Sequence, residues 1–135
     1  MTPTLTALAG FIAWALLLLI IMEAIRTKLV MSGAVPANGF TPDNANLSPF
    51  MQRLARAHAN CIEGLPIFGG LMLVAVVAGK SGVTDSLALV LLGARIVQSS
   101  IHLASTSPAA VTARFAAFTV QMAIAAYWAF ALFTA

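Results

Sequence analysis

Four long apolar runs, separated by polar or Gly/Pro-rich segments, dominate the pattern of this 135-residue chain. They cover residues 5–25, 61–78, 87–104 and 109–133. About 20 consecutive apolar residues suffice for a helix to cross the hydrocarbon core of a bilayer. The pattern therefore predicts an all-α integral membrane protein with four transmembrane helices in one domain, residues 1–135. We expect helices at residues 5–27, 49–79, 84–105 and 108–134.

The segments between the runs contain typical helix-start signals. Ser48-Pro49 and Ser107-Pro108 each place a capping serine before a proline in the first helical position, and Thr84-Asp85 is expected to open the third helix. The second helix then begins about three turns before its apolar part. Residues 28–48 form the one long loop. Because the other connections are short, successive helices should be antiparallel neighbours in a four-helix bundle.

Composition agrees with a membrane protein. Hydrophobic residues make up 61% of the chain and charged residues 8%, whereas soluble domains have roughly 45–50% and 25%. Eleven charges (seven basic and four acidic) cannot cover a soluble surface, and the scattered basic residues form no nucleic-acid stripe. Cys61 is the only cysteine, which excludes an internal disulfide and a cysteine-based zinc site. We expect no metal site and no nucleic-acid partner.

Basic residues near the helix ends predict the orientation, because they favour the cytoplasmic side. The first connection and its flanks contain four of them, the second connection contains Lys80, and Arg114 follows the third. The four are Arg26, Lys28, Arg53 and Arg56. We therefore expect the long loop in the cytoplasm and both termini on the other side. The lack of recognisable retention signals favours a bacterial inner membrane.

Ionisable and amide side chains inside the spans are the candidates for function, because they are costly in a membrane. Arg56, Asn60 and Glu63 share one face of the second helix. On the third helix, one face holds Arg95, Gln98 and His102. In an antiparallel bundle these faces, with Arg26 and Arg114, gather near the cytoplasmic side. The result would be a cationic pocket with one carboxylate, suited to a zwitterionic ligand that carries carboxylates and an amine.

Structural interpretations compete with this functional one. Arg26 is also explained as an orientation anchor, and His102 as an interfacial residue. Arg56 and Glu63 could form an ion pair that only stabilises the fold. Arg95 lies about 10 Å deeper than His102 and needs an interior partner, for which Glu63 is a candidate. Other residues have mainly structural explanations: Arg114 could extend to the interface, Pro66 could kink the second helix, and Cys61 could be a small core residue.

The segment Arg53–Phe68, RLARAHANCIEGLPIF, resembles the signature of the MAPEG family, the membrane-associated proteins of eicosanoid and glutathione metabolism. That family carries R-A-x-x-N-x-x-E followed by a proline at the start of its second helix. The matching residues are Arg56-Ala57, Asn60, Glu63 and Pro66. The motif is closest to the branch of leukotriene C4 synthase and the 5-lipoxygenase-activating protein.

The resemblance implies a homotrimer of four-helix protomers with glutathione bound between neighbouring subunits. Arg56, Asn60 and Glu63 would contact glutathione, with Glu63 taking its amino group. Arg114 would be the catalytic residue that stabilises the thiolate. Four further residues match basic or polar positions around the family's site and would help to bind glutathione. They are Arg26, Arg95, Gln98 and His102.

The expected function is a membrane-bound glutathione-dependent transferase or peroxidase acting on lipophilic electrophiles or peroxides. A non-catalytic lipid-binding or scaffold protein of the same fold is the main alternative. It is favoured by the lack of the family's pocket tyrosines: Tyr127 is the only tyrosine, and Gly64 stands where the leukotriene branch has one. A third alternative is a small transporter or channel subunit, which the charges inside the spans would also suit.

Overall fold

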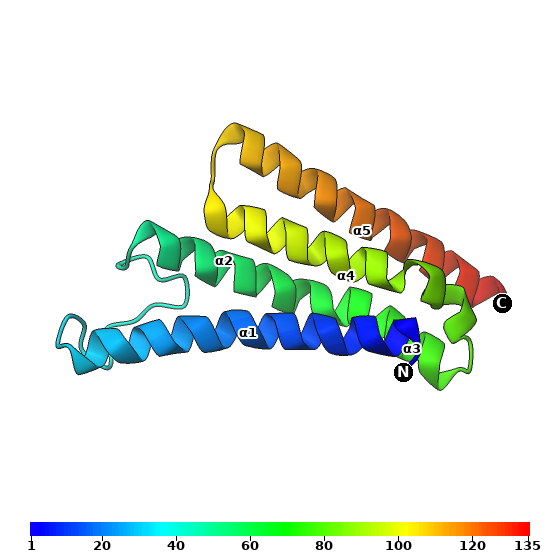
Figure 1. The fold of residues 1–135 in the computed structure, drawn as a ribbon, viewed down its shortest axis with the longest axis horizontal. Helices are drawn as coiled ribbons and strands as arrows, with labels where there is room; N and C mark the ends of the chain where they lie inside the picture. The colour runs from blue at the N-terminus through cyan, green and yellow to red at the C-terminus, as the bar shows by residue number, and fades with distance from the viewer.

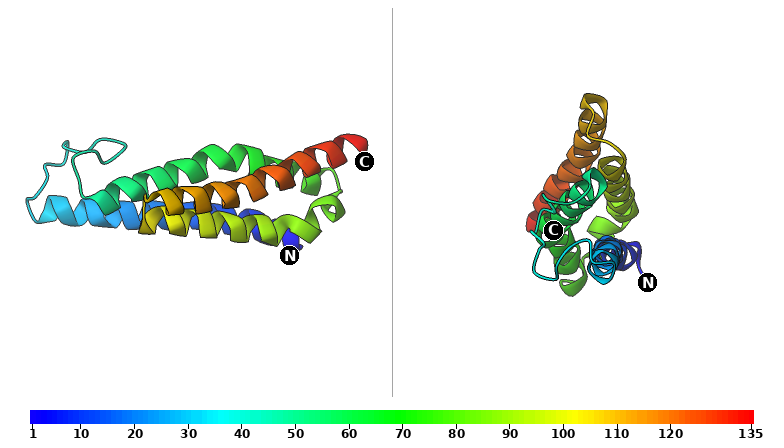
Figure 2. Two further views of the ribbon diagram at one scale, coloured as in Figure 1. Left: turned by 90° about the horizontal axis from the view of Figure 1, so that it is seen from above. Right: turned by 90° about the vertical axis from the view of Figure 1, so that its left-hand side faces the viewer.

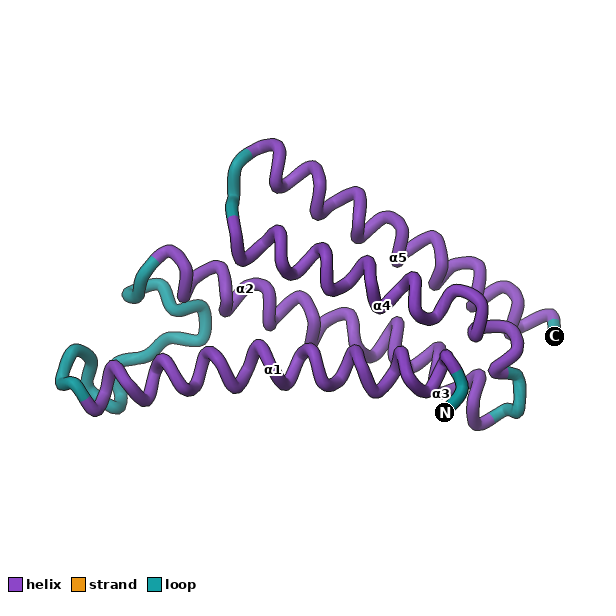
Figure 3. Tube along the Cα trace, viewed as in Figure 1, coloured by secondary structure: helices purple, strands orange, loops and turns teal.

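The computed structural model describes residues 1–135 and is built from helices and loops, without strands (Figures 1 and 3). Four helices are long and apolar enough to cross a membrane, which confirms the predicted fold class. The elements are α1 (Pro3–Met31), α2 (Pro49–Gly64), the π-helical turn η1 (Leu65–Gly69), α3 (Gly70–Val77), α4 (Ser81–Ala104) and α5 (Pro108–Thr134). Because α2, η1 and α3 run on without a break, they form a single span, Pro49–Val77.

Helix α4 lies at the centre of the bundle, where it packs against α1, α2 and α5. Helix α5 rests mainly on α4 and does not pack against α1 or α2. Both termini lie at one end of the molecule, here called the termini end (Figures 1 and 2). The 32–48 loop and the α4–α5 connection lie at the other, the loop end. The space between α2 and α5, with α4 beneath it, is where the candidate site lies.

The serine–proline signals act as predicted. Ser48 Oγ accepts a hydrogen bond from the Met51 amide at 3.3 Å, and Ser107 Oγ accepts one from the Ala110 amide at 3.2 Å. Each proline occupies the first helical position, where no N–H is needed. Both helix starts can therefore be read from local sequence.

The third span begins differently from the sequence prediction. Helix α4 starts at Ser81, three residues before residue 84, and Thr84 and Asp85 lie inside it. Asp85 Oδ1 instead accepts hydrogen bonds from the amide and the hydroxyl of Thr4. A carboxylate is favourable there because the first turn of α1 presents unpaired N–H groups and partial positive charge. The capping signal was real, but it serves a neighbouring helix.

Helix α1 extends to Met31, four residues past the expected end. Gly33 then adopts a left-handed φ of 78°. Its amide donates to Val30 O, and the Ala34 amide donates to Leu29 O, both at 3.0 Å. This pair of bonds is the Schellman motif, which satisfies the last carbonyls of a helix and requires a residue tolerant of positive φ.

Pro66 does not simply bend a continuous α-helix. It lies in η1, where the hydrogen-bonding ladder widens into one π-helical turn before α3 resumes. Proline has no N–H to donate, so an interruption at this position costs less than elsewhere. Phe68 and Gly69 of the turn are buried, which keeps η1 packed within the bundle.

Candidate functional site

A cavity of about 620 Å³ opens between α2 with η1 on one side and α5 on the other, over α4. Six polar residues line it, and all are sequence-predicted site residues. They are Arg56, Asn60 and Glu63 from α2, Arg95 and Gln98 from α4, and Arg114 from α5. The structure thus brings together six of the eight candidates.

The same cavity continues into an apolar part. Ile67 and Phe68 of η1 face Phe118, Met122 and other apolar residues of α5. Met122 lies eight residues, or about 12 Å, past Arg114 away from the loop end. The cavity is therefore amphipathic: its charged residues other than Arg95 lie toward the loop end, and its apolar part, against which Arg95 packs, reaches toward the middle of the span.

The charged groups that line the cavity are not paired with one another. The only ion pair in the structure joins Arg26 and Glu23, outside the cavity. Glu63 and Arg56 are exposed and form no side-chain hydrogen bond or ion pair within the chain. The alternative of a structural Arg56–Glu63 ion pair is therefore wrong. Both side chains are free to bind a ligand.

Arg95 is the most unusual of the six residues. Its side chain is 1% exposed, yet none of its three guanidinium nitrogens has a hydrogen-bond partner. The guanidinium lies 5.3 to 5.9 Å from the ring centres of Phe11, Phe68 and Phe118. Aromatic faces attract a cation, so these rings contribute to holding the guanidinium in place. The expectation that Glu63 pairs with Arg95 is wrong.

Gly64 makes room for this arrangement. A Cβ at residue 64 would lie 2.8 Å from Arg95 Nη2 and 3.1 Å from two carbons of the Phe68 ring. Such a contact is too close for a side chain that is fully enclosed. A residue with a Cβ here would therefore force the Arg95 guanidinium and the Phe68 ring to shift.

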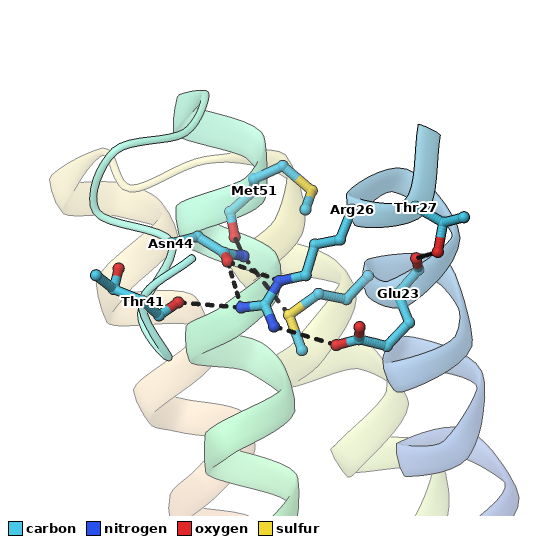
Figure 4. A network of polar contacts seen from close by, with 7 residues as sticks. Glu23, Arg26, Thr27, Thr41, Asn44 and Met51 are labelled. Carbon is cyan, nitrogen blue, oxygen red and sulfur yellow. Dashed lines mark hydrogen bonds and ion pairs between the residues drawn. The ribbon is translucent and has the colours of Figure 1, made fainter. Parts of the chain in front are cut away.

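Arg26 is not brought to the cavity. Its Nε donates to Asn44 Oδ1 at 3.1 Å, its Nη2 donates to the Thr41 carbonyl at 3.1 Å, and its Nη1 pairs with Glu23 at 3.2 Å (Figure 4). These contacts direct the guanidinium toward the 32–48 loop. Within the chain, Arg26 joins that loop to α1, a role that the sequence analysis did not include.

Asn44 is the other half of this network and was missed by sequence reasoning. It is fully buried, adopts a left-handed φ of 55°, and donates from Nδ2 to the Met51 carbonyl at 2.8 Å (Figure 4). Next to it, hydrogen bonds from the Thr41 hydroxyl and the Ala45 amide hold the pKa of the Asp43 carboxyl below its usual value. Asparagine tolerates left-handed backbone and caps turns, which is the signal that could have identified it.

His102 does not line the cavity either. It lies on α4 one turn past Gln98, toward the loop end, and is 2% exposed. Nearby, Arg53 Nε donates to the Leu103 carbonyl at 2.8 Å and so satisfies one of the last carbonyls of α4. At this level the side chains of α4 take part in helix packing.

Gln121 on α5 is a further residue that the sequence analysis missed. It is fully buried, and its Nε2 donates to Gln98 Oε1 at 2.7 Å. A lone amide within the apolar run 109–133 is the signal that could have found it, since an unpaired amide is costly in a membrane.

Elsewhere in the structure, no group of three or more His, Cys, Asp or Glu side chains lies close enough to hold a metal ion. Comparison with curated proteins finds no match. Comparison with known protein families matches residues 4–134 to the MAPEG family. The match spans nearly the whole chain and agrees with the resemblance seen in the second helix. This chain therefore belongs to the MAPEG family.

Proposed function

We propose that this protein is a membrane-bound glutathione-dependent transferase or peroxidase that acts on lipophilic electrophiles or peroxides. Its family includes glutathione transferases and peroxidases as well as non-catalytic members. The observation that carries the proposal is the amphipathic cavity, in which unpaired cations and one unpaired carboxylate adjoin an apolar part.

The polar part of the cavity fits the charges of glutathione, which has two carboxylates, one ammonium group and a thiol. Glu63 is the only acidic residue that lines the cavity and would bind the ammonium group. Arg56 and Arg95 would bind carboxylates, because guanidinium donors match the geometry of a carboxylate. Asn60 and Gln98 add neutral hydrogen-bonding groups.

Arg95 supports this assignment independently of the motif. A buried guanidinium without a hydrogen-bond partner is destabilising in the free protein. Its cost is offset when an anionic group of a ligand enters the cavity and accepts its hydrogen bonds. The unpartnered guanidinium of Arg95 therefore supports the proposal of an anionic ligand.

Arg114 would act on the thiol. Because its guanidinium stays protonated, it would lower the pKa of the glutathione thiol by stabilising the thiolate, without accepting the proton itself. The sulfur then bonds to an electrophilic carbon, and the displaced electron pair goes to the leaving group. With a peroxide, the sulfur attacks oxygen and the O–O bond breaks. The leaving alkoxide takes up a proton equivalent to the one that the thiol released and departs as an alcohol. A second glutathione then reduces the sulfenic acid, giving glutathione disulfide and water.

The apolar part of the cavity would hold the second substrate. Several of its residues remain open to the surroundings of the chain, among them Phe115 at 63% and Ile67 at 59% exposure. We propose that the protein is a homotrimer, in which a neighbouring protomer covers part of this opening. We further propose that the loop end faces the cytoplasm of a bacterial cell, because most basic residues lie there.

A non-catalytic, lipid-binding role is the second candidate. The specific observation in its favour is that no tyrosine lines the cavity, and that Tyr127, the only tyrosine, is 53% exposed. Such a protein would bind lipid in the same cavity without forming a thiolate.

Glutathione binding to the detergent-purified protein, measured by calorimetry together with the ultraviolet absorbance of the thiolate, tests the proposal. We expect Glu63→Gln to weaken binding about tenfold to a hundredfold, as for one lost hydrogen bond to a charged group. Arg114→Ala should preserve binding but remove the thiolate absorbance. Glu23→Gln, outside the cavity, is the matched control.

The outcomes separate the candidates. No binding at millimolar glutathione contradicts a glutathione-dependent enzyme. Binding without a thiolate signal in the wild type favours the non-catalytic role. An unchanged thiolate signal in Arg114→Ala shows that another group performs the role assigned to Arg114. A cross-linking ladder that stops at the dimer contradicts the trimer.

A further inference from the structure

Two buried glutamines meet at the wall of the cavity. Gln98 of α4 lines the cavity, whereas Gln121 of α5 lies behind it and is 0% exposed. Gln121 Nε2 donates to Gln98 Oε1 at 2.7 Å and to the Ala117 carbonyl at 3.1 Å. This pair is the only side-chain hydrogen bond between α4 and α5 in the structure.

The Ala117 carbonyl determines which way both amides point. A backbone carbonyl can only accept, so the Gln121 group that faces it must be the NH₂ group. The same NH₂ group faces Gln98, and the Gln98 atom that it meets must therefore be the carbonyl oxygen. The opposite orientation of either amide would place two donors or two acceptors against each other. The Ala117 carbonyl thus fixes the orientation of the side-chain amides of both Gln121 and Gln98.

The NH₂ group of Gln98 is left for the cavity. It has no hydrogen-bond partner in the protein and is not among the fully buried polar groups. We infer that Gln121 is a positioning residue that holds Gln98 so that the site presents an N–H donor, rather than a carbonyl oxygen, to its ligand. This inference rests on the proposed function, in which the acceptor is a carboxylate or carbonyl oxygen of glutathione.

A purely structural role explains Gln121 poorly. Its own Oε1 is buried without a partner, so the amide imposes a cost that an apolar side chain of similar size would avoid. Methionine at this position would fill the same space between α4 and α5. The retained amide is explained if the direction of Gln98 matters to the ligand.

The experiment compares Gln121→Met, Gln98→Met and the double variant with the wild type in glutathione binding and thermal stability. We expect Gln121→Met to weaken binding about fivefold, the value of one net hydrogen bond, without lowering the unfolding temperature. In the Gln98→Met background, the same change should have no further effect, because the group it positions is gone. Thr119→Val, on the exposed face of α5, is the matched control and should bind as the wild type does.

A second measurement does not depend on glutathione. Proton exchange of the side-chain amides, followed by NMR in the free protein, should be slow for Gln121 and fast for Gln98. If the wild type binds no glutathione, the proposed function fails, and the exchange order alone decides whether Gln121 positions Gln98.

Three results would overturn the inference. The first is unchanged affinity in Gln121→Met. The second is an equal loss of affinity with and without Gln98, together with a lower unfolding temperature, which indicates a structural role. The third is slow exchange at Gln98 with fast exchange at Gln121, which reverses the deduced order.

Discussion

Replacing Asn44 with alanine should release the 32–48 loop from the bundle. Asn44 Oδ1 accepts hydrogen bonds from two nitrogens of Arg26, and its Nδ2 donates to the Met51 carbonyl, so one buried amide joins the loop to both α1 and α2 (Figure 4). Its φ of 55° also lies in the left-handed region. The substitution removes all the side-chain bonds and leaves alanine in an unfavourable backbone conformation.

The magnitude can be estimated from three contributions. Arg26 keeps its contacts with Glu23 and the Thr41 carbonyl, so losing its hydrogen bonds to Asn44 costs only about 1 kcal/mol. The Met51 carbonyl loses its side-chain donor but still accepts a backbone hydrogen bond within α2, so this loss costs about 1 kcal/mol. Left-handed backbone costs a residue with a Cβ about 1–2 kcal/mol. The free energy that holds the loop closed should therefore fall by about 3–4 kcal/mol.

Hydrogen exchange measures this change directly. The Leu47 amide donates to Asn44 O at 2.9 Å inside the loop, and its exchange should accelerate about a hundredfold or more, or to the rate of an unstructured loop. Asn44→Gly tolerates the left-handed backbone and should be milder than Asn44→Ala. Asn46→Ala, an exposed residue with one hydrogen bond to Gly39 O, is the matched control. Equal exchange in Asn44→Ala and Asn46→Ala would refute the reasoning.

Three further predictions concern the core of the site and the termini end. Gly64→Ala should displace Arg95, whose Nη2 lies 2.8 Å from the added Cβ, and weaken glutathione binding about tenfold; an unchanged Kd in calorimetry contradicts this. The protein itself should lose little stability, because overpacking of about 1–3 kcal/mol is partly offset by about 1 kcal/mol of helix propensity. Arg95→Met should raise the unfolding temperature, since it removes an unpartnered buried cation, and should weaken glutathione binding at least tenfold; a lower unfolding temperature would show that the aromatic contacts outweigh desolvation. Asp85→Ala should destabilise the protein by about 1–2 kcal/mol, because the Thr4 amide in the first turn of α1 loses its hydrogen-bond acceptor. Asp43→Ala in the exposed loop serves as the control in the same thermal unfolding, and equal effects would rule out this role of Asp85.

The spans could be predicted from sequence because each is a continuous apolar run long enough for a bilayer, and two of their starts are local serine–proline signals. The third start could not. Thr84 and Asp85 have the composition of a cap, but both bond to Thr4 in the first turn of α1, 80 and 81 residues away in sequence, and only Asp85 accepts from its backbone amide. Local propensity cannot reveal which helix end a carboxylate will reach.

The site shows the same division. Helical periodicity predicts that Arg56, Asn60 and Glu63 share a face, and the structure places all three along the cavity. Helical periodicity could not predict that Arg26 would bond to Asn44, because that contact depends on the path of the 32–48 loop. Nor could it predict that Arg95 would rest on aromatic faces, since sequence patterns suggest a carboxylate for a buried cation.

The π-turn at Leu65–Gly69 lets one span present a cavity-lining face in α2 and a core-facing side in α3. Before it, α2 directs Arg56 and Glu63 into the cavity; after it, α3 buries Met72 and Ala75 completely. A π-helical turn holds one residue more than an α-helical turn. Deleting one residue from this segment would therefore close the ladder into a regular α-helix and leave Met72 and Ala75 facing the core. The same deletion within α2 or α3 would turn every residue after it by about 100°. When relatives are aligned, a one-residue gap is therefore compatible with the same packing at the π-turn, but not in the α-helical parts of the span.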